Sequence, residues 1–227
     1  NPLPGGISNV TGNVEVTLDE DNSTISYLKI IDVDNLSAGY VFDDDSHEIL
    51  EHTMTTDDSF QLCAAGFNDD DIFISNVSAS WSKSGSLDNI SSTSECYTFS
   101  PSTANTAGTI SATATDITED ATETITVNAG VVASIKLLKS SDGNESNEIS
   151  DPETLTTLET LSLWSAGYDA DGNFKENVTS NWSSSGLSLA VSETSTNNIT
   201  FYPNEVGSGI ITANPLPGGI SNVTGNV

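Results

Sequence analysis

Basic side chains are scarce in this sequence. Lysine and arginine together number 5, against 33 aspartate and glutamate residues, so the formal net charge is −28. Nucleic acids and anionic membrane surfaces are bound through Lys and Arg side chains that neutralise phosphate groups. The composition therefore argues against both as partners and makes cations the natural counterpart of the surface.

Long apolar runs and catalytic groupings are also missing. No stretch is long and apolar enough to span a bilayer, and the chain starts without Met or a leader-like segment, so we expect any targeting segment to lie outside it. The only two histidines, His47 and His52 in HEILEH, are five residues apart, whereas a zinc-protease helix needs a spacing of four. We read this stretch as a surface insertion, and we expect no enzyme.

What the sequence does contain is a duplication. Residues 1–14 and residues 214–227 are both NPLPGGISNVTGNV. Self-similarity at a fixed period is typical of repeat proteins. The chain therefore reads as one period of a longer array followed by the start of the next period.

A second repeat lies inside the first. Residues 60–86 align without a gap on residues 161–187, pairing Gly66 with Gly167 and Trp81 with Trp182. Short runs rich in Val, Ile, Thr, Phe and Tyr alternate with Gly, Asn, Asp and Ser clusters, which predicts strands and turns. We expect two tandem β-sandwich domains, at 19–128 and 129–227.

The two domains differ in phase. The first closes with a last strand within 117–127, whereas the second reaches the equivalent turn at its NPLPGG segment and stops soon after. A strand of the right character occurs at 7–18. We therefore assign residues 1–18 to the preceding repeat unit, or to a neighbour that receives them by strand donation, and expect the start of the next repeat to complete the second domain.

Several motifs of the second domain resemble a known family. LWSAGYDADGN (163–173), WSSSG (182–186), TFYP (200–203) and GSGIITA (207–213) look like the bacterial Ig-like domains of invasin/intimin-type tandem cell-surface repeats. The first domain carries looser versions. The resemblance implies an all-β fold of Ig-like sandwiches and adhesion-type or fibre-type work outside the cell.

Two cysteines, Cys63 and Cys96, fall on strands expected to be neighbours in an Ig-like sheet. Alternation places Leu62 inward and both cysteines outward. An even count in an exterior protein favours a cross-strand disulfide on the outer face, the alternative being two free thiols. Trp164 occupies the place of Cys63 in the second domain and is a candidate inter-unit contact, whereas Trp81 and Trp182 are expected in the cores.

The motif DADGN places three oxygen-bearing side chains, those of Asp169, Asp171 and Asn173, at alternate positions before and after a Gly turn. Such spacing is found at the start of calcium loops, although the Glu required at the twelfth position of an EF-hand is replaced by Ser180. Either a weak Ca²⁺ site or a polar turn fits this pattern. No other cofactor is expected.

Asn-x-Ser/Thr sequons mark candidate N-glycosylation sites. They occur at Asn9, Asn22, Asn35, Asn76, Asn89, Asn144, Asn177, Asn181 and Asn198, and that of Asn9 recurs at Asn222.

Together these features predict a structural repeat unit of an extracellular filament, surface fibre or adhesin stalk, whose partners are neighbouring copies of itself assembled head-to-tail. One alternative is a glycan-binding or surface-binding module that uses exposed aromatic residues such as Tyr40, Trp164 and Tyr168. Another is an accessory Ig-like region of a secreted enzyme.

Overall fold

The computed structural model describes residues 24–32, 40–41, 48–149, 152–186, 195–203, 205–216 and 218–227. They form strands β1 to β19 and one 3₁₀ turn, η1 (Glu145–Asn147), so the fold is all-β as predicted. No helix within these ranges has the length and hydrophobicity needed to cross a membrane. The predicted last strand at 7–18 lies outside the described residues.

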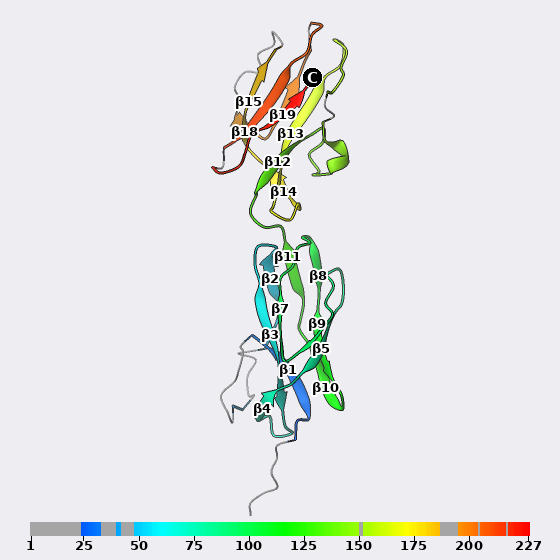
Figure 1. The fold of residues 1–227 in the computed structure, drawn as a ribbon, viewed down its shortest axis with the longest axis vertical. Coiled ribbons are helices and arrows are strands. Elements are labelled where there is room, and N and C mark those ends of the chain that lie inside the picture. Colours follow the sequence, from blue (N-terminus) through cyan, green and yellow to red (C-terminus); the bar gives the residue numbers. More distant parts are fainter. Residues whose placement is uncertain are drawn as a thin grey trace, which may run out of the picture.

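The strands fall into two groups stacked along the long axis of the molecule (Figure 1), and no pairing joins the groups in the described ranges. We name β1–β11 the N-terminal half and β12–β19 the C-terminal half. Reading each half as an independent domain, with the boundary near residue 129, stays a prediction.

The N-terminal half is a sandwich closed on one side. Antiparallel β3 pairs with β1 and β7, while β9 pairs with β5 and β10, and the parallel pair β1–β10 joins the two layers. β11 lies between β2, to which it is parallel, and β8, to which it is antiparallel. The strands are β1 (Tyr27–Ile31), β2 (His52–Thr55), β3 (Phe60–Phe67), β4 (Phe73–Asn76), β5 (Ala79–Lys83), β6 (Ser92–Ser94), β7 (Cys96–Phe99), β8 (Thr106–Gly108), β9 (Ile110–Ala114), β10 (Ile117–Ala121) and β11 (Ile125–Asn128).

The C-terminal half has two four-stranded sheets. β13 pairs with β12, β14 and β17 in one sheet, and the other runs in the order β16-β15-β18-β19. This is the strand pairing of Ig-like sandwiches. The strands are β12 (Ser134–Leu138), β13 (Leu161–Tyr168), β14 (Phe174–Asn177), β15 (Ser180–Ser185), β16 (Ser195–Thr196), β17 (Asn198–Phe201), β18 (Ile210–Pro215) and β19 (Val223–Asn226).

Each half has its own core, and a tryptophan lies in each. Trp81 on β5 is 3% exposed and Trp182 on β15 is fully buried, which confirms the prediction for both. Their indole N–H groups donate to the main-chain carbonyls of Ser94 and Thr196, both at 2.9 Å. A buried indole needs such an acceptor, and the two halves supply it in the same way.

The offset of 101 residues holds in three dimensions. Trp81 is paired with Ala112 in the N-terminal half, and Trp182 with Ala213 in the C-terminal half. Gly85 and Gly186 both have positive φ, and a Cβ on either would meet main-chain atoms at equivalent places, Ala107 and Gly108 in one half and Ser208 and Gly209 in the other. The repeat therefore preserves strand register and not only composition.

The connection from β1 to β3 is not the surface insertion expected from HEILEH. Ile49 and Met54 are 8% and 4% exposed and belong to the core, and β2 pairs with β11. His47 lies outside the described residues. The second copy of the duplicated segment ends β18 and forms β19, which extends the second sheet of the C-terminal half.

Candidate functional site

The candidate site is the junction where the two halves meet. The turn between β13 and β14 lies beside the ends of β2, β8 and β11 (Figure 1), and the chain crosses from one half to the other at Ala129, Gly130 and Val131. Ala129 is 4% exposed. Gly130 is buried as well, whereas Val131 is 74% exposed, so the connection is enclosed as far as Gly130 and emerges at Val131.

Asp169 is the centre of this junction. Its side chain is 2% exposed at the end of β13. The Oδ1 atom accepts from the main-chain N–H groups of Asp171 (3.1 Å) and Asn173 (2.8 Å). The Oδ2 atom accepts from Thr56 Oγ1 (2.7 Å) and from the N–H of Gly130 (3.1 Å). One carboxylate thus closes its own turn with one oxygen and joins the N-terminal half with the other.

These donors keep the carboxylate ionised. Burial by itself raises the pKa of Asp169, but hydrogen bonds from Thr56, Asn173 and Gly130 favour the charged form more strongly and lower its pKa to about 2. A buried charge is stable when hydrogen-bond donors surround it. Asp169 therefore needs no basic partner, which suits a chain with so few Lys and Arg residues.

Asn173 adds a second link across the junction. Its Oδ1 atom accepts from the N–H of Ala104 at 3.0 Å, and its Nδ2 atom donates to the carbonyl of Ser102 at 2.9 Å and to Asp169 Oδ2 at 3.0 Å. The loop before β8 is thereby held against the β13–β14 turn. Both the direction and the distance between the halves are constrained because these bonds come from two separate loops.

Two further contacts surround the crossing. Lys175 Nζ donates to the carbonyl of Ala129 at 2.6 Å, and Asp57 Oδ2 accepts from the N–H of Val131 at 2.6 Å. Any Cβ at position 130 would collide with the Asp57 carboxylate. Glycine leaves room for this carboxylate, which would have to shift to admit a larger residue at position 130.

The structure gives the predicted calcium ligands a different set of contacts. Asp169 and Asn173 engage each other and the N-terminal half, and Asp171 is exposed. The described part of the chain contains no cluster of three or more His, Cys, Asp or Glu that could hold a metal ion. Ca²⁺ binding by this turn stays a prediction, and binding there would compete with the hydrogen bonds just described.

The equivalent turn of the N-terminal half is built in the same way around Asn68. This side chain is 1% exposed, and its Oδ1 atom accepts from the N–H groups of Asp70 (3.1 Å) and Ile72 (2.9 Å). The turn itself therefore needs only one side-chain oxygen. Asp169 has a second side-chain oxygen, and this one accepts the hydrogen bonds of the junction. The replacement of Asn68 by Asp169 between the aligned repeats is therefore the sequence signal that could have indicated the junction.

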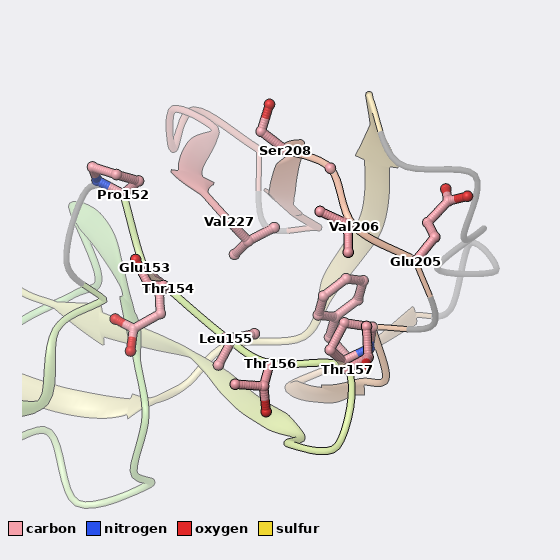
Figure 2. Close-up of a pocket in the computed structure, with 13 residues that line it drawn as sticks. Pro152, Glu153, Thr154, Leu155, Thr156, Thr157, Glu205, Val206, Ser208 and Val227 are labelled. Atoms are coloured by element: carbon pink, nitrogen blue, oxygen red, sulfur yellow. The ribbon is translucent and has the colours of Figure 1, made fainter.

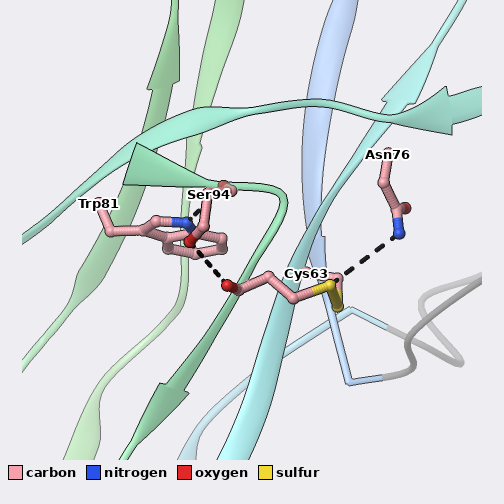
Figure 3. Close-up of a disulfide and its surroundings, with 5 residues drawn as sticks. Cys63, Asn76, Trp81 and Ser94 are labelled. Carbon is pink, nitrogen blue, oxygen red and sulfur yellow. Dashed lines mark hydrogen bonds between the residues drawn. A yellow bond between two sulfur atoms is a disulfide. The ribbon is translucent and has the colours of Figure 1, made fainter. Parts of the chain in front are cut away.

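Cys63 and Cys96 form the expected disulfide across β3 and β7, where they are register partners with Cα atoms 4.0 Å apart (Figure 3). They lie on the face of the sheet away from the main core, as alternation predicted. That face is not solvent-exposed at Cys63, which is fully buried in a second cluster with Ile31, Phe67 and Phe73. The disulfide therefore reinforces a small outer core.

Other candidate residues are dispersed. Trp164 on β13 is half-buried opposite Leu138 and Asn198, and an inter-unit role for it stays a prediction. Tyr168 is 2% exposed and donates to the carbonyl of Gly143, so it does not belong to an exposed aromatic patch.

The sequons have varied surroundings, and glycosylation stays a prediction for all of them. Asn89, Asn144, Asn198 and Asn222 are exposed, whereas Asn76, Asn177 and Asn181 are half-buried. The Nδ2 atom of Asn177, which would carry a glycan, donates to the carbonyl of Ser141 at 2.9 Å. Asn9, Asn22 and Asn35 lie outside the described residues.

Comparisons with known proteins identify no family. No family model matches the chain, and no curated protein matches it. Among solved structures it is similar to the three N-terminal domains of the Highly Immunogenic Outer Capsid protein (Hoc) of bacteriophage RB49, at 12% identity and a TM-score of 0.23. That match covers 90% of this chain and 58% of the Hoc chain. A similarity of this degree supports no conclusion about function.

Proposed function

We propose that this chain is a structural repeat unit of an extracellular filament or surface fibre, in which copies follow one another head-to-tail. The observation that carries the proposal is the junction centred on Asp169, where direct hydrogen bonds from two loops fix one half on the end of the other. A repeat unit that extends a fibre away from a surface needs connections between its domains that resist bending. This one has a buried, ionised joint in place of a flexible linker.

Four other features support the same function. The duplicated segment at 1–14 and 214–227 gives the period of an array, and the net charge of −28 keeps neighbouring fibres apart by repulsion. Leu158 and Val206, which are 95% and 98% exposed, provide apolar surface on the C-terminal half for a following unit. The disulfide suits an oxidising exterior. None of this work requires catalysis.

The experiment is small-angle X-ray scattering on the 227-residue chain, with a double variant that removes the Oδ2 contacts, Thr56→Val with Asp169→Asn. Asp171→Asn is the matched control, since it removes a charge from the same turn at an exposed position. We expect one extended particle for the wild type and the control, and a broader distribution of maximum dimensions for the double variant. A wild type as flexible as the double variant would overturn the proposal.

A further inference from the structure

The C-terminal half contains an open slot that its counterpart has filled. In the N-terminal half, β11 lies between β2 and β8, and Ile125 and Val127 on it are fully buried. In the C-terminal half, a cavity of about 460 Å³ lies between residues 152–157 and residues 205–208, with Val227 at its inner end (Figure 2). The two walls are the equivalents of β2 and β8.

Matching hydrogen bonds establish this equivalence. Thr55 donates its N–H to Asp58 Oδ2, and 101 residues later Thr156 donates its N–H to Glu159 Oε2, both at 2.8 Å. His52 donates its N–H to the carbonyl of Thr124. Its counterpart Glu153 donates in the same way to the carbonyl of Asn226, at 2.9 Å.

The position of Val227 in this scheme is therefore fixed. Val227 and Gly209 exchange two main-chain hydrogen bonds, at 2.7 and 2.8 Å, just as Ile125 is the antiparallel partner of Gly108. Val227 thus occupies the first position of the strand that corresponds to β11. The next three positions, those of Thr126, Val127 and Asn128, are the open slot.

Exposure of the walls shows what the slot lacks. Thr106 beside β11 is 7% exposed, whereas its counterpart Gly207 is exposed. Met54 is 4% exposed, and its counterpart Leu155 is only half-buried. An apolar cleft between the counterparts of two paired strands is a candidate site for an added strand, because such a strand can pair with main-chain groups of both walls.

The duplicated segment indicates which residues would fill the slot. Residue 227 is the same position of the repeat as Val14, so the residues that follow in the array are Glu15, Val16, Thr17 and Leu18. With Val227 in the place of Ile125, this segment puts Val16 at the buried position of Val127 and Glu15 at the position of Thr126. A shift by one residue would bury Glu15, so only one register fits.

We infer that the slot between residues 152–157 and 205–208 binds residues 15–17 of a second copy of this sequence as the missing strand. The inference rests on the proposed head-to-tail assembly and gives it a mechanism. A copy that supplies this strand completes the C-terminal half of its neighbour. Growth of the fibre and folding of the slot are then one event.

The first test is binding of a labelled peptide, residues 15–22, to the full 227-residue chain, followed by fluorescence anisotropy. We expect saturable one-to-one binding, and a loss of affinity of at least about tenfold for the Val16→Asp peptide, because it places a charge at a buried position. Peptides of the same composition in scrambled order are the control. Equal binding of the native and scrambled peptides, or no binding, would overturn the inference.

The second test joins residues 15–22 to the C-terminus after Val227. We expect the extension to raise the melting temperature of the chain by about 5–10 °C and to abolish binding of the labelled peptide, because its site is then filled. An extension carrying Val16→Asp should give neither effect. An extension without effect on either readout would overturn the inference. If scattering shows a rigid particle but the peptide does not bind, the fibre function stands and only strand binding is refuted. If the particle is flexible but the peptide binds, only the fibre function is refuted.

Discussion

Replacing Asp169 with Asn tests the buried joint at the level of single atoms. Asn keeps one side-chain oxygen, and Asn68 shows that one oxygen is enough to close this type of turn. The replacement instead removes the charge and the acceptor that faces Thr56 and Gly130. The local fold should therefore survive, and the loss should fall on the link between the halves.

The magnitude follows from the pKa of the carboxyl group. Its pKa is lowered from 3.8 to about 2, and each unit of difference between folded and unfolded states is worth about 1.4 kcal/mol. Asp169 thus contributes about 2 kcal/mol at neutral pH. Because the folded-state pKa is the lower one, this contribution is complete above about pH 4 and is lost as the pH falls through about 2.

The assay is urea unfolding followed by tryptophan fluorescence, for wild type, Asp169→Asn and Asp171→Asn, from pH 7 down to pH 2. At pH 7 we expect Asp169→Asn to lower the free energy of unfolding by about 2 kcal/mol and Asp171→Asn to change it by less than about 0.5 kcal/mol. The gap between wild type and Asp169→Asn should narrow below pH 4. Equal losses in both variants, or a gap that is independent of pH, would refute the reasoning.

Two further predictions concern each half separately. Replacing both Cys63 and Cys96 with Ala should lower the stability of the N-terminal half by about 3–4 kcal/mol, because the disulfide no longer closes a loop in the unfolded chain. Calorimetry should show a lower melting temperature for one unfolding transition only, and a shift of the transitions of both halves would contradict the prediction. Gly143→Ala should cost about 1–3 kcal/mol, because φ is +71° there and a Cβ would collide with Phe174. Gly218→Ala, where a Cβ meets nothing within 4 Å, is its control in thermal melts, and equal melting temperatures of the two variants would count against the clash.

The strands and both cores could be predicted because the sequence repeats them. The offset between Trp81 and Trp182 aligns β3 with β13 and β5 with β15, and alternation along these strands gives the buried face. The environment of Cys63 could not be read in this way. Ala65 and Phe67, in the same phase as Cys63, are as apolar as Leu62 and Ala64 in the other phase, so alternation alone does not tell a covered outer face from an exposed one.

The junction was beyond sequence reasoning for a different reason. The residues of DADGN by themselves predict a turn or a metal-binding loop. The groups that bind Asp169 across the junction are Thr56, which lies 113 residues earlier in the sequence, and Gly130 at the crossing. Distances of that kind are set by how two sandwiches meet. The slot, by contrast, was partly foreseeable: the phase difference between the halves predicted a strand supplied from outside, and the structure adds where its walls are.

The two parallel pairs in the N-terminal half, β1–β10 and β2–β11, bear on how a fibre would carry tension. Both run along the long axis of the molecule (Figure 1), so a pull on its ends slides each pair lengthwise. In β2–β11, which has four register pairs, such a pull loads the hydrogen bonds of the ladder together instead of opening them one by one. By the strand donation inferred above, a C-terminal half gains the equivalent of the β2–β11 pair only when its slot is filled. We therefore expect a unit with an empty slot to yield to force before a unit whose slot is filled.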